Sequence, residues 1–169
     1  VFPSTVQKAQ IDDWSPQGVL LSNGPGDPAA LKTQIRLVEH LLGQYPLFGI
    51  CLGHQLLALA VGARTYKMKF GHRGINHPVG LDPRGRVWVT VHNHGFAVDE
   101  GSLPSAAQVT LRSLNDGTLE GFDLPGYRAM AVQFHPEASP GPHEAGEWFL
   151  KFRRLMSDSS SLKMDPNRL

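Results

Sequence analysis

The chain has 169 residues, a length typical of one domain with a core of its own. It is 41% hydrophobic and 18% charged, as in ordinary globular proteins, and its formal net charge of +1 provides no basic stripe for nucleic acid. No apolar run approaches the ~20 residues of a membrane span, so we expect neither nucleic-acid nor membrane binding.

The first third of the chain alternates between strand and helix patterns. Apolar runs predict the end of a strand at residues 1–2 and buried strands at 18–22 and 47–50. Apolar spacing and composition predict helices over 7–14, 29–42 and 52–61. Strands that alternate with helices indicate a parallel sheet covered by helices.

The middle of the chain has a different pattern, in which strands are joined by turns rich in Gly, Pro and Asp. Some of these strands are expected to pair antiparallel; they are 64–67, 86–91, 108–113 and 128–134. A closing helix is expected over 146–156, followed by a polar tail at 157–169. The predicted fold class is α/β, with an open, mostly parallel sheet flanked by helices and a smaller antiparallel sheet.

Cys51 is the only cysteine, so no disulfide can form within the chain. With no signal peptide in view, this predicts a reducing, cytoplasmic setting. A lone cysteine is either inert or reactive, and composition alone favours an inert residue, because free cysteines are among the most buried residues.

The surroundings of Cys51 favour a reactive cysteine. Gly49, Cys51 and Gly53 form the cysteine version of the Gly-x-Ser-x-Gly nucleophile elbow, between a predicted strand and a predicted helix. The helix N-terminus is expected to lower the thiol pKa, and the N–H of Leu52 is placed to donate to an oxyanion. A small residue packed between strand and helix is the alternative, but packing alone does not require both glycines.

A cysteine nucleophile needs a general base, and His135 is the best placed of the eight histidines. It follows the apolar run 129–134, so it would share the carboxyl edge of the sheet with Cys51. Glu137 could accept a hydrogen bond from its ring and fix the tautomer. A surface histidine and a solvated acid are the alternatives when these two residues are considered alone.

Two further features could suggest other sites. His92 and His94 could share one face of a strand as a metal pair, but no third ligand follows with metal-site spacing, so no metal site is predicted.

The loop Ser22–Pro28 is rich in glycine but lacks the Gly-Lys-Ser/Thr of a phosphate loop. Either it is a simple turn, or its N–H groups face the reacting carbonyl.

Three motifs occur in order along the chain: Ser22-Asn-Gly-Pro-Gly-Asp-Pro28, Gly49-Ile-Cys-Leu-Gly-His-Gln55 and His135-Pro-Glu137. Together they resemble the motifs of the class I (triad) glutamine amidotransferases, whose fold is flavodoxin-like. Within that family, residues 67–78, 93–99 and 135–143 are similar to the small (glutaminase) subunits of carbamoyl phosphate synthetase. The resemblance covers roughly residues 1–156.

The resemblance implies a role for each matching residue. Cys51 would attack the side-chain amide of L-glutamine and form a glutamyl thioester, releasing ammonia. His135 would carry the protons and Glu137 would hold His135, while the N–H groups of Gly24 and Leu52 would form the oxyanion hole. Residues implied to hold the substrate, with turn and packing duty as the alternative, are Gly26, Gln55, Asn93, Gly95 and Phe96.

The resemblance also implies a partner. Ammonia would pass through a tunnel to a large synthetase subunit, which would use ATP and Mg²⁺ to make carbamoyl phosphate for pyrimidine and arginine biosynthesis. No cofactor is expected in this chain.

The chain departs from the family pattern in three ways. Residues 1–156 correspond to an amidotransferase domain without its first strand and helix, and the small subunit's N-terminal domain, which supplies a serine contact to glutamine, is not matched. His92 stands where the family usually has Gln. The chain is therefore expected to be weakly active alone. The alternatives are a non-catalytic, partner-binding piece, or the glutaminase of another amidotransferase, such as the anthranilate or aminodeoxychorismate type.

Overall fold

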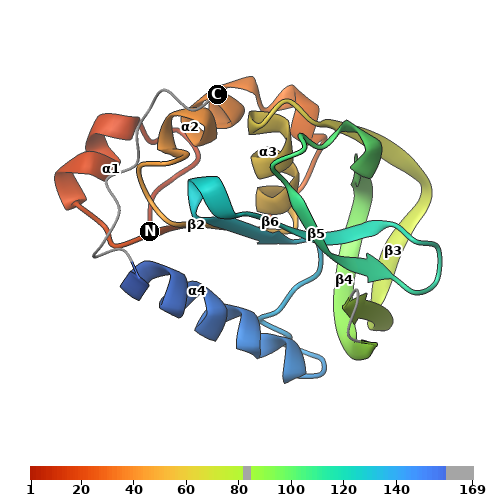
Figure 1. Ribbon diagram of the computed structural model, residues 1–169. Coiled ribbons are helices and arrows are strands. Elements are labelled where there is room, and N and C mark those ends of the chain that lie inside the picture. Colours follow the sequence, from red (N-terminus) through yellow and green to blue (C-terminus); the bar gives the residue numbers. More distant parts are fainter. Residues whose placement is uncertain (82–84, 159–169) are drawn as a thin grey trace.

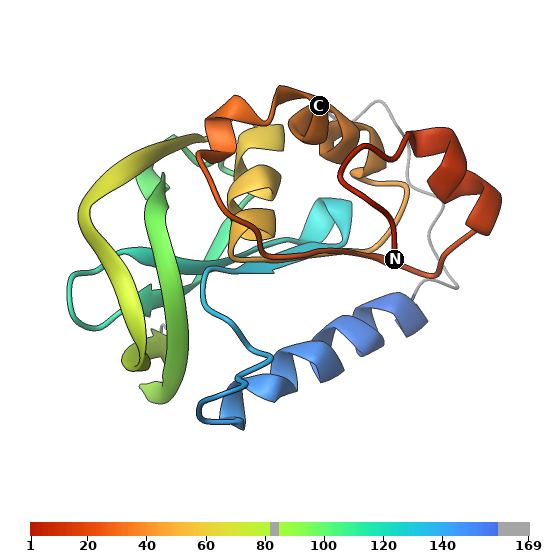
Figure 2. The ribbon, with the colours of Figure 1, turned by 180° about the vertical axis from the view of Figure 1, so that it is seen from behind.

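A computed structural model describes residues 1–81 and 85–158, which form three layers (Figures 1 and 2). A central sheet has helices on both faces. The helices are α1 (Lys8–Trp14), α2 (Lys32–Leu41), α3 (Leu52–Ala60) and α4 (Glu147–Ser157). The strands are β1 (Val19–Leu21), β2 (Leu47–Ile50), β3 (Arg64–Leu81), β4 (Arg86–Asp99), β5 (Gln108–Ser113), β6 (Leu119–Leu124) and β7 (Ala129–Val132).

The sheet has seven strands in the order β1-β2-β7-β6-β5-β3-β4. β2 lies parallel to both β1 and β7, and every residue of β2 and β7 is buried, as expected for central strands covered on both faces. The remaining neighbours pair antiparallel. The predicted α/β class is confirmed, but the antiparallel strands continue the same sheet instead of forming a separate, smaller one.

Two apolar cores lie on opposite faces of this sheet, because successive side chains of a strand point to opposite faces. Leu47 packs into the core under α1, α2 and α3, together with residues such as Leu57. The next residue, Phe48, packs into the core under α4, where its ring centroid is 5.5 Å from that of Phe152. The parallel strands are therefore held from both sides.

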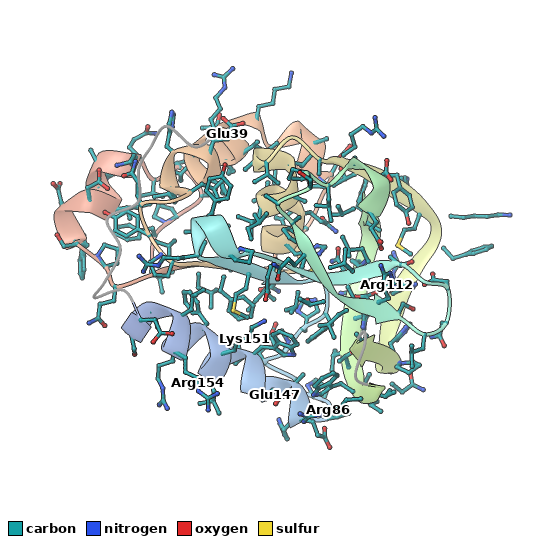
Figure 3. The ribbon with its side chains drawn as sticks, viewed as in Figure 1. Glu39, Arg86, Arg112, Glu147, Lys151 and Arg154 are labelled. Atoms are coloured by element: carbon teal, nitrogen blue, oxygen red, sulfur yellow. The ribbon has the colours of Figure 1, made fainter. Side chains whose placement is uncertain are left out.

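Polar contacts also attach α4 to the sheet (Figure 3). Glu147 accepts a hydrogen bond of 2.6 Å from the Trp88 indole and lies 3.2 Å from the Arg86 guanidinium. Lys151 pairs with Asp123 of β6 at 2.8 Å. These contacts fix both the position and the rotation of α4. None of the described helices is long and apolar enough to cross a membrane.

The structure corrects several predicted elements. β3 and β4 are much longer than the predicted strands at 64–67 and 86–91. The pairing of β3 with β4 is irregular near Gly71 and Gly74, which both have positive φ. These irregularities bend the strand without ending it. β6 was not predicted, since it includes the charged residues Glu120 and Asp123. Residues 1–2 are not in a strand, Ser157 belongs to α4, and the predicted tail from residue 159 onward lies outside the described residues.

Gly53 sets how closely α3 approaches the sheet. A Cβ at this position would lie 2.2 Å from the carbonyl oxygen of Leu21 in β1. We expect Gly53→Ala to lower the free energy of unfolding by about 2–3 kcal/mol, as other overpacked sites do. Gly126→Ala, where an added Cβ meets nothing within 4 Å, is the matched control and should change it by less than about 0.5 kcal/mol. Urea unfolding curves would measure both, and equal effects would contradict the close approach.

Candidate active site

Cys51 occupies the sharp turn between β2 and α3. Its backbone has φ 52° and ψ −100°, a conformation that L side chains rarely adopt, and its N–H donates to Val132 O of β7 at 2.9 Å. A Cβ on Gly49 would lie 2.5 Å from the carbonyl oxygen of Gly53, so the turn closes only with glycine at both positions. The predicted elbow geometry is therefore present.

Cys51 is only 4% exposed, and its surroundings determine the charge of its sulfur. Burial raises the pKa of the Cys51 thiol to about 11, although a hydrogen bond from the Leu52 backbone opposes this shift and the charge of Glu137 adds to it. The expectation of a lowered pKa at the helix N-terminus is wrong, because loss of solvation outweighs the hydrogen bond from the first helical N–H, that of Leu52. The resting residue is a thiol and needs a base to become nucleophilic.

His135 and Glu137 form the pair that the sequence predicts. Ring atom Nδ1 of His135 lies 2.8 Å from Glu137 Oε1, and the backbone N–H of His135 donates to Val91 O at 2.8 Å. Because a carboxylate only accepts, the proton belongs on Nδ1 and the lone pair on Nε2. Nε2 is buried and has no hydrogen-bond partner among the described residues, so it is free to take a proton.

Cys51 and His135 line the same pocket, which has a volume of about 420 Å³. It lies at the carboxyl ends of the parallel strands, the edge where open α/β sheets bind ligands. Six of the predicted site residues line it: Gly24, Gly26, Cys51, Asn93, Gly95 and His135.

The other predicted site residues do not line the pocket; they are Leu52, Gln55, Phe96 and Glu137. Leu52 begins α3 directly after Cys51, and its N–H reaches the sulfur. Gln55 is buried, and its amide nitrogen donates to Phe96 O at 2.8 Å and to Gln133 Oε1 at 2.9 Å. Gln55 therefore fixes the backbone at Phe96, and its amide nitrogen is already bonded to the protein.

Sequence reasoning missed four lining residues: Asn23, Pro25, Arg73 and His94. Arg73 brings a positive charge to the pocket wall, and its guanidinium donates to Phe70 O at 2.6 Å. It lies on the part of β3 beyond residue 67 that was not predicted as a strand, so no sequence signal placed it here. Asn23 and Pro25 belong to the glycine-rich loop, and the run Asn23-Gly-Pro-Gly26 could have indicated them.

The fold and the pocket place a cysteine at the edge of an α/β sheet, and a family model described as "Glutamine amidotransferase class-I" matches residues 1–155. The chain belongs to this family. It is 51% identical to the carbamoyl phosphate synthase small chain of Thermotoga maritima and 52% identical to that of Salmonella typhimurium. Each alignment covers 92% of this chain but only 48% and 41%, respectively, of those proteins, so the chain spans less than half of their length.

Solved structures agree on the fold. The chain resembles a glutamine amidotransferase from Thermotoga maritima with a TM-score of 0.60 and 26% identity, over 89% of this chain and 66% of that one. It resembles a protein described as one subunit of a GMP synthase, from Thermoplasma acidophilum, with a TM-score of 0.77 over 93% of this chain and 80% of that one. At 22% identity, the second likeness concerns the fold alone.

The raised pKa of Cys51 predicts how its alkylation depends on pH. Only the thiolate reacts, so the rate with iodoacetamide should rise about tenfold per pH unit from pH 7 and level off only near pH 11. Because Cys51 is the only cysteine, intact mass spectrometry reads this rate directly. A rate that is already constant below pH 8 would mean that the resting residue is a thiolate, contrary to the burial argument.

Proposed function

We propose that this chain hydrolyses L-glutamine to glutamate and ammonia with Cys51 as the nucleophile. One observation carries the proposal: the strained Cys51 shares a pocket with a His135 ring whose Nδ1 is bonded to Glu137 and whose Nε2 is free. This is the arrangement of nucleophile, base and orienting acid that acyl transfer requires. Membership of the class I family supports it.

The reaction has two halves. Nε2 of His135 takes the thiol proton while the sulfur of Cys51 attacks the side-chain amide carbon of glutamine. The C–N bond then breaks, and His135 returns its proton to the leaving ammonia, which leaves a glutamyl thioester on Cys51. In the second half a water gives a proton to His135 as it attacks the thioester, and the C–S bond breaks to give glutamate and the restored thiol.

The negative charge that develops on the carbonyl oxygen needs donors in place before the reaction. The backbone N–H groups of Gly24 and Leu52 are assigned this role, since Gly24 lines the pocket beside Cys51 and Leu52 begins α3. The residues assigned to substrate binding are Gly26, Asn93 and Gly95. Gln55 holds the Phe96 backbone in position for the substrate.

We further propose that the ammonia passes to a large synthetase subunit that makes carbamoyl phosphate. The names of the relatives support this, because a small chain implies a large one. ATP and Mg²⁺ would act on that partner, so this chain would need no cofactor of its own. A soluble, cytoplasmic complex is the setting that we expect.

Glutamate release from L-glutamine tests the chemistry. Cys51→Ser should abolish it, and His135→Asn should lower kcat by about 10²–10⁴-fold, the usual contribution of a general acid–base. His40→Asn, at an exposed histidine of α2, is the matched control and should change nothing. If the unmodified chain is no faster than Cys51→Ser, the chain is a non-catalytic or partner-binding piece and the enzymatic proposal fails.

The partner is tested separately. Adding the chain and glutamine to a carbamoyl phosphate synthetase large subunit should raise its bicarbonate-dependent ATP turnover, because the chain then delivers ammonia directly to that subunit. Cys51→Ser should remove the effect without preventing binding. Glutaminase activity combined with no response of the large subunit would favour an anthranilate or aminodeoxychorismate type of amidotransferase instead.

A further inference from the structure

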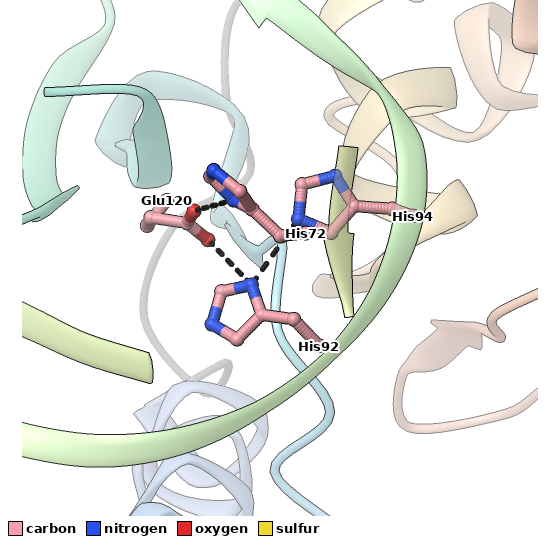
Figure 4. A group of neighbouring side chains, drawn as sticks. All are labelled: His72, His92, His94 and Glu120. Atoms are coloured by element: carbon pink, nitrogen blue, oxygen red, sulfur yellow. Dashed lines mark hydrogen bonds and ion pairs between the residues drawn. The ribbon is translucent and has the colours of Figure 1, made fainter. Parts of the chain in front are cut away.

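Four side chains of types that commonly bind metal ions lie close together beside the pocket (Figure 4). His72 comes from β3, His92 and His94 from β4, and Glu120 from β6, and all four are buried. His92 and His94 share one face of β4, and His72 lies directly opposite His94 across the β3–β4 ladder. One ligand atom from each residue lies within 4.8 Å of all the others.

The spacing of these atoms fits one small cation. The ligands of a tetrahedral zinc ion with bonds of about 2.0–2.1 Å lie about 3.3–3.4 Å from one another. Here His92 Nδ1 is 3.1 Å from His94 Nε2, and His72 Nδ1 is 3.3 Å from Glu120 Oε1. The third contact, between His92 Nδ1 and Glu120 Oε2, is 3.7 Å. These three distances are close to the tetrahedral spacing, and the remaining pairs of ligand atoms lie within 4.8 Å, so the rings would close in when the ion binds.

Each imidazole has an outer partner on its other nitrogen, as metal-bound histidines almost always do. Nε2 of His72 lies 2.9 Å from an Asp116 oxygen, and Nε2 of His92 lies 2.8 Å from the Thr90 hydroxyl. Nδ1 of His94 lies 3.0 Å from the carbonyl oxygen of Phe96. These contacts hold the rings so that the inner nitrogens converge.

Hydrogen positions also favour a cation. A carbonyl oxygen only accepts, so His94 carries its proton on Nδ1 and presents a lone pair at Nε2. Thr90 Oγ1 lies 3.0 Å from His77 O, and when it donates there, His92 must donate to Thr90. Two ring lone pairs then face each other across 3.1 Å, which is stable only with a positive charge between them. The metal-free alternative is a chain of donations from Thr90 through His92 to His94.

Glu120 is the second, independent observation. Its side chain is 0% exposed, and its only hydrogen-bond contact among the described residues is a long one, of 3.3 Å, from His72 Nδ1 to Oε1. Its neighbours are the inner nitrogens of His72 and His92, at 3.3 and 3.7 Å. A buried carboxylate is strongly destabilising unless a cation or hydrogen bonds compensate it.

We propose that His72, His92, His94 and Glu120 bind one Zn²⁺ ion. Three imidazoles and one carboxylate suit zinc, and four protein ligands close the coordination shell, as in a structural site. The ion would tie β3 and β4 to β6 and fix the backbone on either side of Asn93 and Gly95 in the pocket wall. The proposal does not depend on the glutaminase activity.

Metal content and thermal unfolding test the site. After the chain is stripped with a chelator, Zn²⁺ should rebind at one equivalent per chain and raise Tm progressively with free zinc, because it binds the folded state. Mg²⁺ should have no effect, since it prefers oxygen ligands. Co²⁺ should give the visible bands of a four-coordinate ion without the near-ultraviolet band of a cobalt–thiolate bond.

Substitutions locate the ion. His92→Gln and Glu120→Gln keep polar groups of similar size and should each weaken zinc binding by more than about 100-fold, beyond the 10–100-fold that outer partners contribute. His40→Gln and Cys51→Ser should each keep one equivalent. If a ligand variant does not fold, the cobalt spectrum of the unmodified chain still decides, because a thiolate band would place the ion at Cys51.

Three results would overturn the proposal. The first is a folded, stripped chain that takes up no stoichiometric zinc and whose Tm does not respond to it. The second is zinc bound equally by His92→Gln, Glu120→Gln and the unmodified chain. The third is zinc lost in Cys51→Ser but kept in His92→Gln, which would place the ion at the pocket nucleophile.

Discussion

The structure depends on the position of β2 between β1 and β7. Parallel pairing brings the carboxyl ends of these strands to one edge, and the hydrogen bond from Cys51 N–H to Val132 O continues the β2–β7 register into the turn. The turn closes because Gly49 and Gly53 let the first residues of α3 come within contact of the strands. The strain at Cys51 is therefore maintained by a sheet that is packed on both faces.

Burial keeps the Cys51 thiol away from solvent and also lowers its nucleophilicity at neutral pH. Removing Cys51 from solvent raises its pKa, so the residue does not ionise alone at neutral pH. The charge of Glu137 strengthens this effect, yet the same carboxylate orients the ring of His135. The one acid thus disfavours the thiolate and orients the imidazole, and under the proposed mechanism proton transfer depends on His135.

The sequence predicted the elements whose signals are local. The apolar runs of β2 and β7 and the glycines around Cys51 indicated the parallel strands and the elbow, and the class I motifs indicated the pocket loop. β6 was missed because a strand with a buried acid breaks the apolar pattern, and the groups nearest that acid, Glu120, are His72 and His92, which are distant in the chain. The pair His92 and His94 was visible in the sequence, but the rest of the cluster was not, because the irregular β3 brings His72 opposite His94 and no spacing in the sequence encodes that register.

Covalent trapping tests most directly whether the turn at Cys51 forms a nucleophile served by His135. A glutamine analogue with a diazoketone in place of the side-chain amide should take a proton, lose N₂ and form a thioether with the sulfur. We expect one adduct, on Cys51 alone, slowed by excess L-glutamine but not D-glutamine, and much slower in His135→Asn. No adduct, or one formed equally fast in His135→Asn and in the presence of L-glutamine, would contradict the account.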